Sequence, residues 1–231
     1  HETAEYAANI LLDSYIRLQQ YDKMLALANQ LLKKKSFLED NEDLTARLKD
    51  IQAKAERKKV EKLAADKKWV ECGEGFSKIY NSNPDGEGMD EVLYNAGDCY
   101  ENGKSIGLAI YMFKLLQKRF PKSKQAQKAL VRLGNNFGAI AYYEQAAQMY
   151  EAYAKKYGGE EDASKALSNA VLYRKGIGDD DKAISNTRFF VKKYKMNLKK
   201  ESADALFSMA GIYEMRNERD NLVKHLQGYL K

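Results

Sequence analysis

The sequence predicts an all-α solenoid, a stack of helix–turn–helix units. The main observation is a repeat in which a small residue is followed four positions later by a larger one, every 37 residues. The pairs are Cys72 and Phe76, Ala109 and Phe113, Ala146 and Tyr150, and, more weakly, Ala183 and Thr187. Residues i and i+4 lie one turn apart on a helix, so each pair marks one helix face. Because the face returns at a fixed period, each unit is expected to bury it against its neighbours.

The composition supports helices and gives no sign of a membrane span. Of 231 residues only two are proline and 44% are hydrophobic, while Leu, Ala, Lys, Glu and Gln, all good helix formers, are frequent. No run of about 18 apolar residues occurs, so no transmembrane segment is predicted. The chain starts at His1 rather than Met, and no polar capping helix precedes Lys231. We therefore expect a fragment of a longer parent chain.

The apolar pattern divides the chain into about six helix pairs. The second pair is expected to begin with a long, charged helix at about 42–65 and to end at the turn 83–86. The fifth is expected to have one extra residue in its turn, 176–180. The predicted units cover about residues 1–36, 37–88, 89–122, 123–159, 160–198 and 199–231.

Two of these units carry a recognisable motif. The third reads Leu93-x2-Ala96-Gly97-x2-Tyr100, Ala109-x3-Phe113 and Pro121, and the fourth reads Leu130-x2-Leu133-Gly134-x2-Phe137 and Ala146-x3-Tyr150. Both resemble the tetratricopeptide repeat (TPR), W-x2-L-G-x2-Y, A-x3-F, P. The glycines allow the helices to approach closely, and the aromatic residues fill the space between them. The resemblance implies a right-handed superhelix and a non-enzymatic scaffold that binds other proteins.

The period of 37 residues suggests a subgroup of this family. With the joint Phe120-Pro121-Lys122-Ser123, it resembles TPR proteins of the bacterial envelope. The stretch 94–157 and the tail 205–231 are similar to envelope proteins of myxobacteria, including those of gliding motility. This resemblance implies a periplasmic or envelope-associated location, in an assembly for motility, secretion or envelope biogenesis.

In TPR superhelices the first helices line a groove, which gives a set of candidate partner-binding residues. They are Tyr94, Asp98, Val131, Asn135, Leu167, Val171 and Phe207. Only Asn135 matches the Lys and Asn residues with which some family members hold a peptide carboxylate, so the resemblance favours an apolar or helical partner, or a further helix of the parent chain. Alternatively, these side chains fold between neighbouring first helices and only join the units.

Basic pairs also recur every 37 residues, at the expected ends of the second helices. They are Lys118 and Arg119, Lys155 and Lys156, and Lys192 and Lys193. The helix dipole stabilises cations there by about 0.3–1 kcal/mol each, which is a sufficient local reason. The alternative function is an accessory subunit whose basic edge binds an anionic polymer or a membrane surface. The net charge of +6 is mostly interleaved with acidic residues, so no nucleic acid is expected as a partner.

No pattern of catalytic, metal-binding or cofactor-binding residues is evident. Asp179-Asp180-Asp181 lacks the ligand spacing of a calcium loop, and His225 has no ligand neighbour at helical spacing. We therefore expect no enzyme activity, metal or cofactor. Cys72 and Cys99 are expected to be small buried thiols rather than a disulfide.

Overall fold

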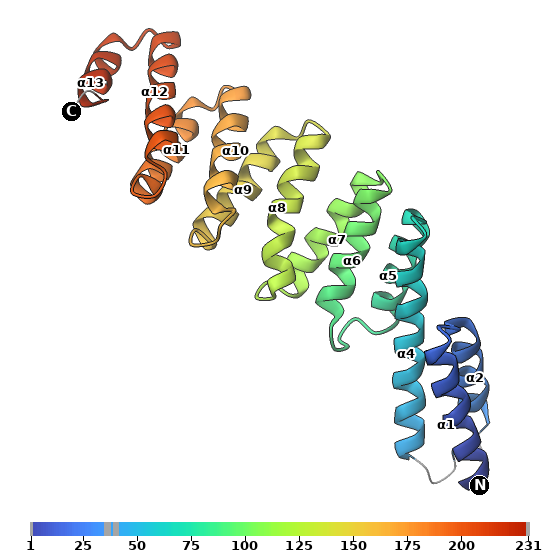
Figure 1. The fold of residues 1–231 in the computed structure, drawn as a ribbon. Helices are drawn as coiled ribbons and strands as arrows, with labels where there is room; N and C mark the ends of the chain where they lie inside the picture. Colours follow the sequence, from blue (N-terminus) through green and yellow to red (C-terminus); the bar gives the residue numbers. More distant parts are fainter. Residues whose placement is uncertain (1, 35–37, 39–41, 230–231) are drawn as a thin grey trace. The chain divides into compact units, whose positions relative to one another are not determined.

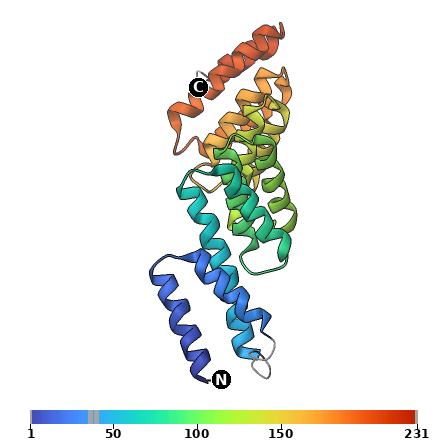
Figure 2. The same ribbon diagram turned by 90° about the vertical axis from the view of Figure 1, so that its right-hand side faces the viewer.

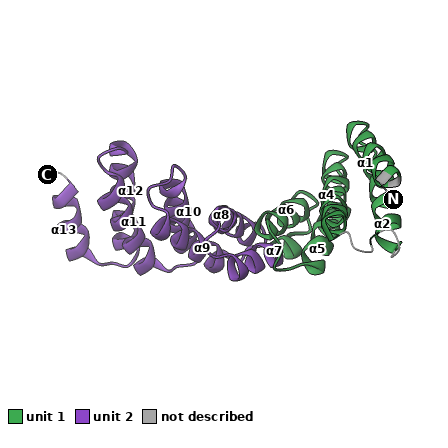
Figure 3. Cartoon of the chain, turned by 90° about the horizontal axis from the view of Figure 1, so that it is seen from below, with its two compact units in different colours: residues 1–109 green, residues 110–231 purple. Residues whose placement is uncertain are grey.

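The computed structural model describes residues 2–34, 38 and 42–229 (Figure 1). Over these ranges it contains twelve helices and no strand, which confirms the predicted all-α class. The helices form two compact units, residues 1–109 and 110–231, coloured separately in Figure 3. The boundary between the units lies inside α7 (Ile106–Arg119). The predicted division at residues 36 and 37 lies outside the described ranges.

Unit 1 contains five complete helices. They are α1 (Glu2–Arg17), α2 (Tyr21–Lys33), α4 (Glu42–Ala65), α5 (Trp69–Ser82) and α6 (Met89–Asn102). The pair α1–α2 lies beside the first half of α4, as Figures 1 and 2 both show. The apolar side chains of Leu12, Met24 and Leu48 form the core between these three helices.

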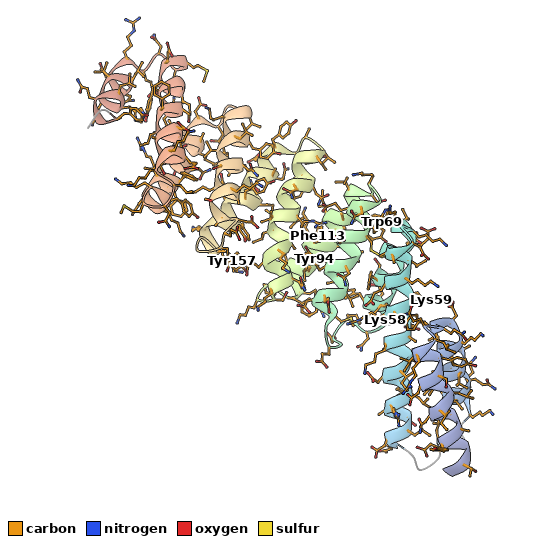
Figure 4. The ribbon with its side chains drawn as sticks, in the orientation of Figure 1. Lys58, Lys59, Trp69, Tyr94, Phe113 and Tyr157 are labelled. Atoms are coloured by element: carbon orange, nitrogen blue, oxygen red, sulfur yellow. A yellow bond between two sulfur atoms is a disulfide. The ribbon has the colours of Figure 1, made fainter. Side chains whose placement is uncertain are left out.

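Helix α4 has the bounds that the sequence predicts, and its two halves pack against different helices. Its first half buries Leu44 and Leu48 against α1 and α2. Its second half packs Val60 over α5, where a Cβ atom at Gly75 would lie 2.6 Å from a Val60 methyl group. Lys58 and Lys59 in this half are exposed (Figure 4), and Lys59 forms an ion pair with Asp22 of α2 at 2.7 Å. Because the apolar stripe runs the length of α4, one long helix connects two packing layers.

Cys72 on α5 and Cys99 on α6 form a disulfide, so the prediction of two free thiols was wrong. Their Cα atoms lie 5.8 Å apart, and both side chains are buried, as expected. The close approach has a local cause next to Cys72. A Cβ atom at Gly73 would lie 2.6 Å from the ring of Tyr100, so only glycine lets α5 come this near to α6. The two cysteines therefore face each other across a tight helix contact.

Unit 2 contains the end of α7 and six further helices. They are α8 (Lys124–Ala139), α9 (Tyr143–Lys156), α10 (Ala163–Gly176), α11 (Asp180–Tyr194), α12 (Lys199–Met215) and α13 (Arg219–Tyr229). Ser123 caps α8, since its hydroxyl accepts a hydrogen bond from the Ala126 amide at 3.0 Å. Each helix in the series packs on the next one, from α8 through α13.

Every first helix ends in the same turn. Two residues past the end of each of these helices the backbone adopts the left-handed conformation, and the amide of the next residue donates to a carbonyl five residues earlier. The left-handed residues are Gln19, Lys67, Lys104, Ala141, Gly178 and Asn217. This is a Schellman-type ending, which satisfies carbonyls that the helix leaves unpaired. Only one of the six residues is glycine.

The close contacts predicted from the repeat are present in the fourth pair. A Cβ atom at Gly134 would lie 2.7 Å from the ring of Tyr150, so the α8 backbone lies directly against that ring. Ala146 and Phe113 (labelled in Figure 4) are completely buried. The small residue and the ring thus fill the core of unit 2 as the repeat predicts.

We expect substitutions at these two positions to destabilise unit 2. Ala146→Leu overfills a packed contact and should cost about 1–3 kcal/mol. Phe113→Ala leaves a cavity and should cost about 3–5 kcal/mol. Denaturant unfolding followed by circular dichroism measures both values. If either variant unfolds like the wild type, the residue does not occupy the packed position assigned to it.

Candidate protein-interaction site

The predicted partner-binding residues lie on the first helices, but they differ in exposure. In unit 2, Val131 is half-buried, Asn135 is exposed and Phe207 is 59% exposed. In the same unit Leu167 is buried, packed with Ala154 and Phe190. Its side chain therefore offers no surface to a partner. In unit 1, Tyr94 and Asp98 lie half-buried on α6, and Asp98 accepts a hydrogen bond from the side chain of Asn102.

The burial pattern corrects the alignment of the fifth pair by one residue. Leu167 is buried like Leu130, 37 positions earlier, and the left-handed turn residues Ala141 and Gly178 are also 37 apart. The turn 176–180 therefore has no extra residue, contrary to the prediction. On α10 the residues equivalent to Val131 and Asn135 are Ser168 and Leu172, rather than Leu167 and Val171.

With this alignment the exposed face of the first helices in unit 2 is partly apolar. Leu172 on α10 is 66% exposed, and Phe207 on α12 is 59% exposed. The ring of Phe207 lies 5.8 Å from that of Tyr229 on α13, with a tilt of 52° between them. We call Val131, Leu172 and Phe207 the first-helix row. Its members come from alternate helices, and the intervening helix α11 packs against both α10 and α12.

A buried arginine, which the sequence analysis missed, lies on the same helix as Leu172. Arg174 on α10 is almost fully buried, and its Nε and Nη2 donate to the two carboxylate oxygens of Glu151 at 2.8 and 2.9 Å. Its Nη1 donates to Asp179 at 3.0 Å, and Asn186 on α11 donates to Glu151 at 2.7 Å. The network thereby connects α9, α10 and α11. The hydrogen bonds and charge of Glu151 raise the pKa of Arg174 despite burial.

Arg174 escaped notice because of the misaligned fifth pair. In the corrected alignment it occupies the position of the aromatic residues Tyr100, Phe137 and Tyr213. An arginine at an aromatic core position requires a carboxylate partner. The sequence signal was therefore present, since Glu151 lies on the preceding helix, but it depended on the correct alignment.

Three tyrosines stack between α9 and α10. The ring of Tyr173 lies 5.4 Å from that of Tyr143 and 6.1 Å from that of Tyr150, with interplanar angles of 17° and 6°. The Tyr150 hydroxyl donates to the side-chain oxygen of Asn135 at 2.5 Å. Burial, above all, raises the pKa of Tyr150 to about 12. Asn135 is thus held by an internal contact, although its residue surface is exposed.

The six residues of the predicted basic pairs are all exposed, and one of them, Lys156, joins two neighbouring turns. Lys156 donates to the carbonyl of Pro121 at 3.1 Å, in the turn one repeat earlier. Similarly, the Tyr194 hydroxyl donates to the carbonyl of Gly158 at 3.1 Å. The Nζ atom of Lys193 lies 5.6 Å from the ring centroid of Phe189. The turns that follow α7, α9 and α11 therefore lie next to one another along one edge of unit 2.

In the described part of the chain, no group of three or more His, Cys, Asp or Glu residues could hold a metal ion. None of the helices in these ranges is long and apolar enough to cross a membrane. The ring Nε2 of His225 lies 2.7 Å from the carbonyl oxygen of Leu206, which places this histidine in the α12–α13 contact.

Similarity to known proteins agrees with this architecture. Residues 91–123 match the family model of the tetratricopeptide repeat. MamA AMB-1 has a similar structure, with a TM-score of 0.54 and 14% identity over 78% of this chain and 91% of that one. A crystal structure of MamA protein has a TM-score of 0.53 and 18% identity, over 77% of this chain and 90% of that one. MamA 41-end from Desulfovibrio magneticus RS-1 has a TM-score of 0.50 and 17% identity, over 77% of this chain and 93% of that one.

These likenesses show the fold alone, because the identities are low. No curated protein matches the sequence. The chain has an all-helical fold that resembles TPR solenoids. The segment that matches the repeat itself lies almost entirely in the third predicted helix pair. This fold is typical of scaffolds that bind other proteins.

We expect the Arg174 network to be important for stability. Glu151→Ala removes the bidentate partner of a buried guanidinium and should cost about 3–5 kcal/mol. Glu144→Ala is the matched control, since Glu144 is exposed and lies 4.0 Å from Arg174. It should change stability by less than about 1 kcal/mol. Equal effects in denaturant unfolding would contradict the assigned role of Glu151.

Proposed function

We propose that this chain is a non-enzymatic scaffold of six helix pairs that binds another protein through the first-helix row of unit 2. The observation that carries the proposal is the exposure of Leu172 and Phe207, two large apolar side chains on first helices. Large exposed apolar side chains on corresponding helix faces are typical of binding surfaces. The Arg174 network lies two residues from Leu172 and holds α10 against its neighbours, so the surface is presented on a rigid support.

The chemistry of the row favours an apolar helix as the partner. The position of Asn135 is occupied by Leu172 on α10 and by Gly211 on α12, so no lysine is available there to bind a terminal carboxylate. An amphipathic helix places apolar side chains at intervals of three and four residues, which can contact an apolar row of this kind. The partner class proposed is therefore a protein segment with an apolar helical face.

We further propose that the assembly belongs to the bacterial envelope, with motility, secretion or envelope biogenesis as its process. The Cys72–Cys99 disulfide supports this location, because structural disulfides persist mainly in oxidising compartments such as the periplasm. The period of 37 residues and the joint 120–123, which resemble envelope TPR proteins, point the same way. The similarity to myxobacterial gliding-motility proteins makes motility one of the candidate processes.

Capture from detergent extracts of envelopes tests the binding row. The double variant Leu172→Ser/Phe207→Ser should lose proteins that the wild type retains. Met215→Ser is the matched control, since Met215 is equally exposed but lies at the end of α12. The control should retain the same proteins. Thermal unfolding must be similar for all three chains, and unchanged capture by the double variant would contradict the proposed row.

Thiol trapping in the native cells tests the proposed compartment. Cys72 and Cys99 should resist alkylation in denatured, freshly quenched protein until a reductant is added. The bridge closes a segment with a sequence separation of 27 residues. Its loss in a Cys72→Ala/Cys99→Ala variant should therefore lower the free energy of unfolding by about 3.5 kcal/mol. Two freely alkylated thiols in the cell would argue against the envelope.

A further inference from the structure

One turn of unit 2 combines a dense positive charge with a protruding apolar side chain. The segment 188–200 between α11 and α12 contains six Lys and Arg residues and no Asp or Glu. We propose that this turn docks on the anionic headgroups of a lipid bilayer. The basic side chains contact the lipid phosphates, and the side chain of Met196 enters the interface. This contact goes beyond the proposed protein-binding function and uses a different surface.

Among the described residues, the lysines of this turn have no carboxylate partner. The lysines concerned are all exposed: Lys192, Lys193, Lys195, Lys199 and Lys200. None of them pairs with a carboxylate in the part of the chain that the structure describes. They are therefore available to anions from outside the molecule.

Helix stability explains only some of these lysines. Lys192 and Lys193 lie in the last turn of α11, where the helix dipole favours cations. Lys199 and Lys200 lie in the first turn of α12, where the same dipole disfavours them. Two cations held against the dipole, beside three others, indicate a role outside the fold.

Met196 supplies the second observation, which is independent of charge. Its side chain is 77% exposed at the tip of the turn. The turn itself is well anchored, since the amides of Asn197 and Leu198 both donate to the carbonyl of Tyr194. Leu198 and Tyr194 pack against the core that contains Phe190. An exposed apolar side chain on a fixed turn, surrounded by cations, has the chemistry of a peripheral membrane contact.

The neighbouring turn favours a lipid surface over a long soluble polyanion. The α9–α10 turn lies next to this one through the hydrogen bond from Tyr194 to Gly158, and it carries Glu160, Glu161 and Asp162. A polyanion that followed the whole edge would meet these carboxylates, whereas a bilayer can contact the α11–α12 turn alone. A soluble polyanion would also gain nothing from the apolar side chain of Met196.

Vesicle sedimentation with the complete chain tests the proposal. The wild type should bind vesicles of equal parts phosphatidylglycerol and phosphatidylcholine, and should not bind phosphatidylcholine alone. Binding should weaken steeply with added salt. Lys199→Gln/Lys200→Gln should weaken vesicle binding by at least about tenfold. Each lysine near an anionic surface contributes about 1 kcal/mol, which is slightly less than a tenfold change in affinity. Equal binding to both vesicle types would overturn the proposal.

Matched variants separate a specific site from general positive charge. Lys67→Gln/Lys68→Gln makes the same charge change in the α4–α5 turn and should leave vesicle binding nearly unchanged. Met196→Ser should weaken binding severalfold without altering thermal unfolding, and Met215→Ser should have no effect. If Lys67→Gln/Lys68→Gln weakens vesicle binding as much as Lys199→Gln/Lys200→Gln does, the lipid contact is not localised in the α11–α12 turn. If soluble polyphosphate binds as tightly as the vesicles and Met196→Ser has no effect, the ligand is a soluble polyanion.

Discussion

The close approach of helix backbones to aromatic rings is the constraint on which the rest of this structure depends. At Gly73 and Gly134 a single Cβ atom would lie 2.6 and 2.7 Å from the rings of Tyr100 and Tyr150, inside van der Waals contact. Neighbouring helices can therefore pack closely only where one of them lacks a side chain. The same closeness brings Cys72 and Cys99 within bonding distance. The disulfide thus fixes a contact that the packing already requires.

Periodic features of the sequence were sufficient to predict the helices, because each repeat must bury the same apolar face. The bounds of α4 and the burial of Phe113 and Ala146 follow from this pattern. The left-handed turns that end the first helices could not be predicted in the same way. Lys104 and Ala141, for example, adopt positive φ angles without being glycine, because the packed helices on either side impose the turn.

The candidate site was harder to predict than the fold, since it depends on alignment to a single residue. A shift of one position in the fifth pair assigned Leu167 to the surface, although it is buried, and overlooked Leu172, which is exposed. The cause is visible at Arg174, which replaces the aromatic residue by which such a helix is normally aligned. Using Tyr173, the residue before Arg174, as that aromatic residue shifts the alignment by one position. The disulfide was missed for a related reason, because Cys72 and Cys99 belong to neighbouring helix pairs and face each other only when α5 packs on α6.

Departures from the repeat are the informative positions in a chain of this kind. Residues that recur in each unit, such as the small residue and its ring, are explained by stacking, so they carry little information about function. Leu172, Met196 and Lys199 do not recur. Leu172 and Met196 expose apolar surface, and Lys199 opposes the dipole of the helix that it begins. A residue that weakens local stability persists when something outside the fold compensates for it. The two proposed external contacts, of the first-helix row with a protein and of the α11–α12 turn with a lipid surface, both include residues of this kind.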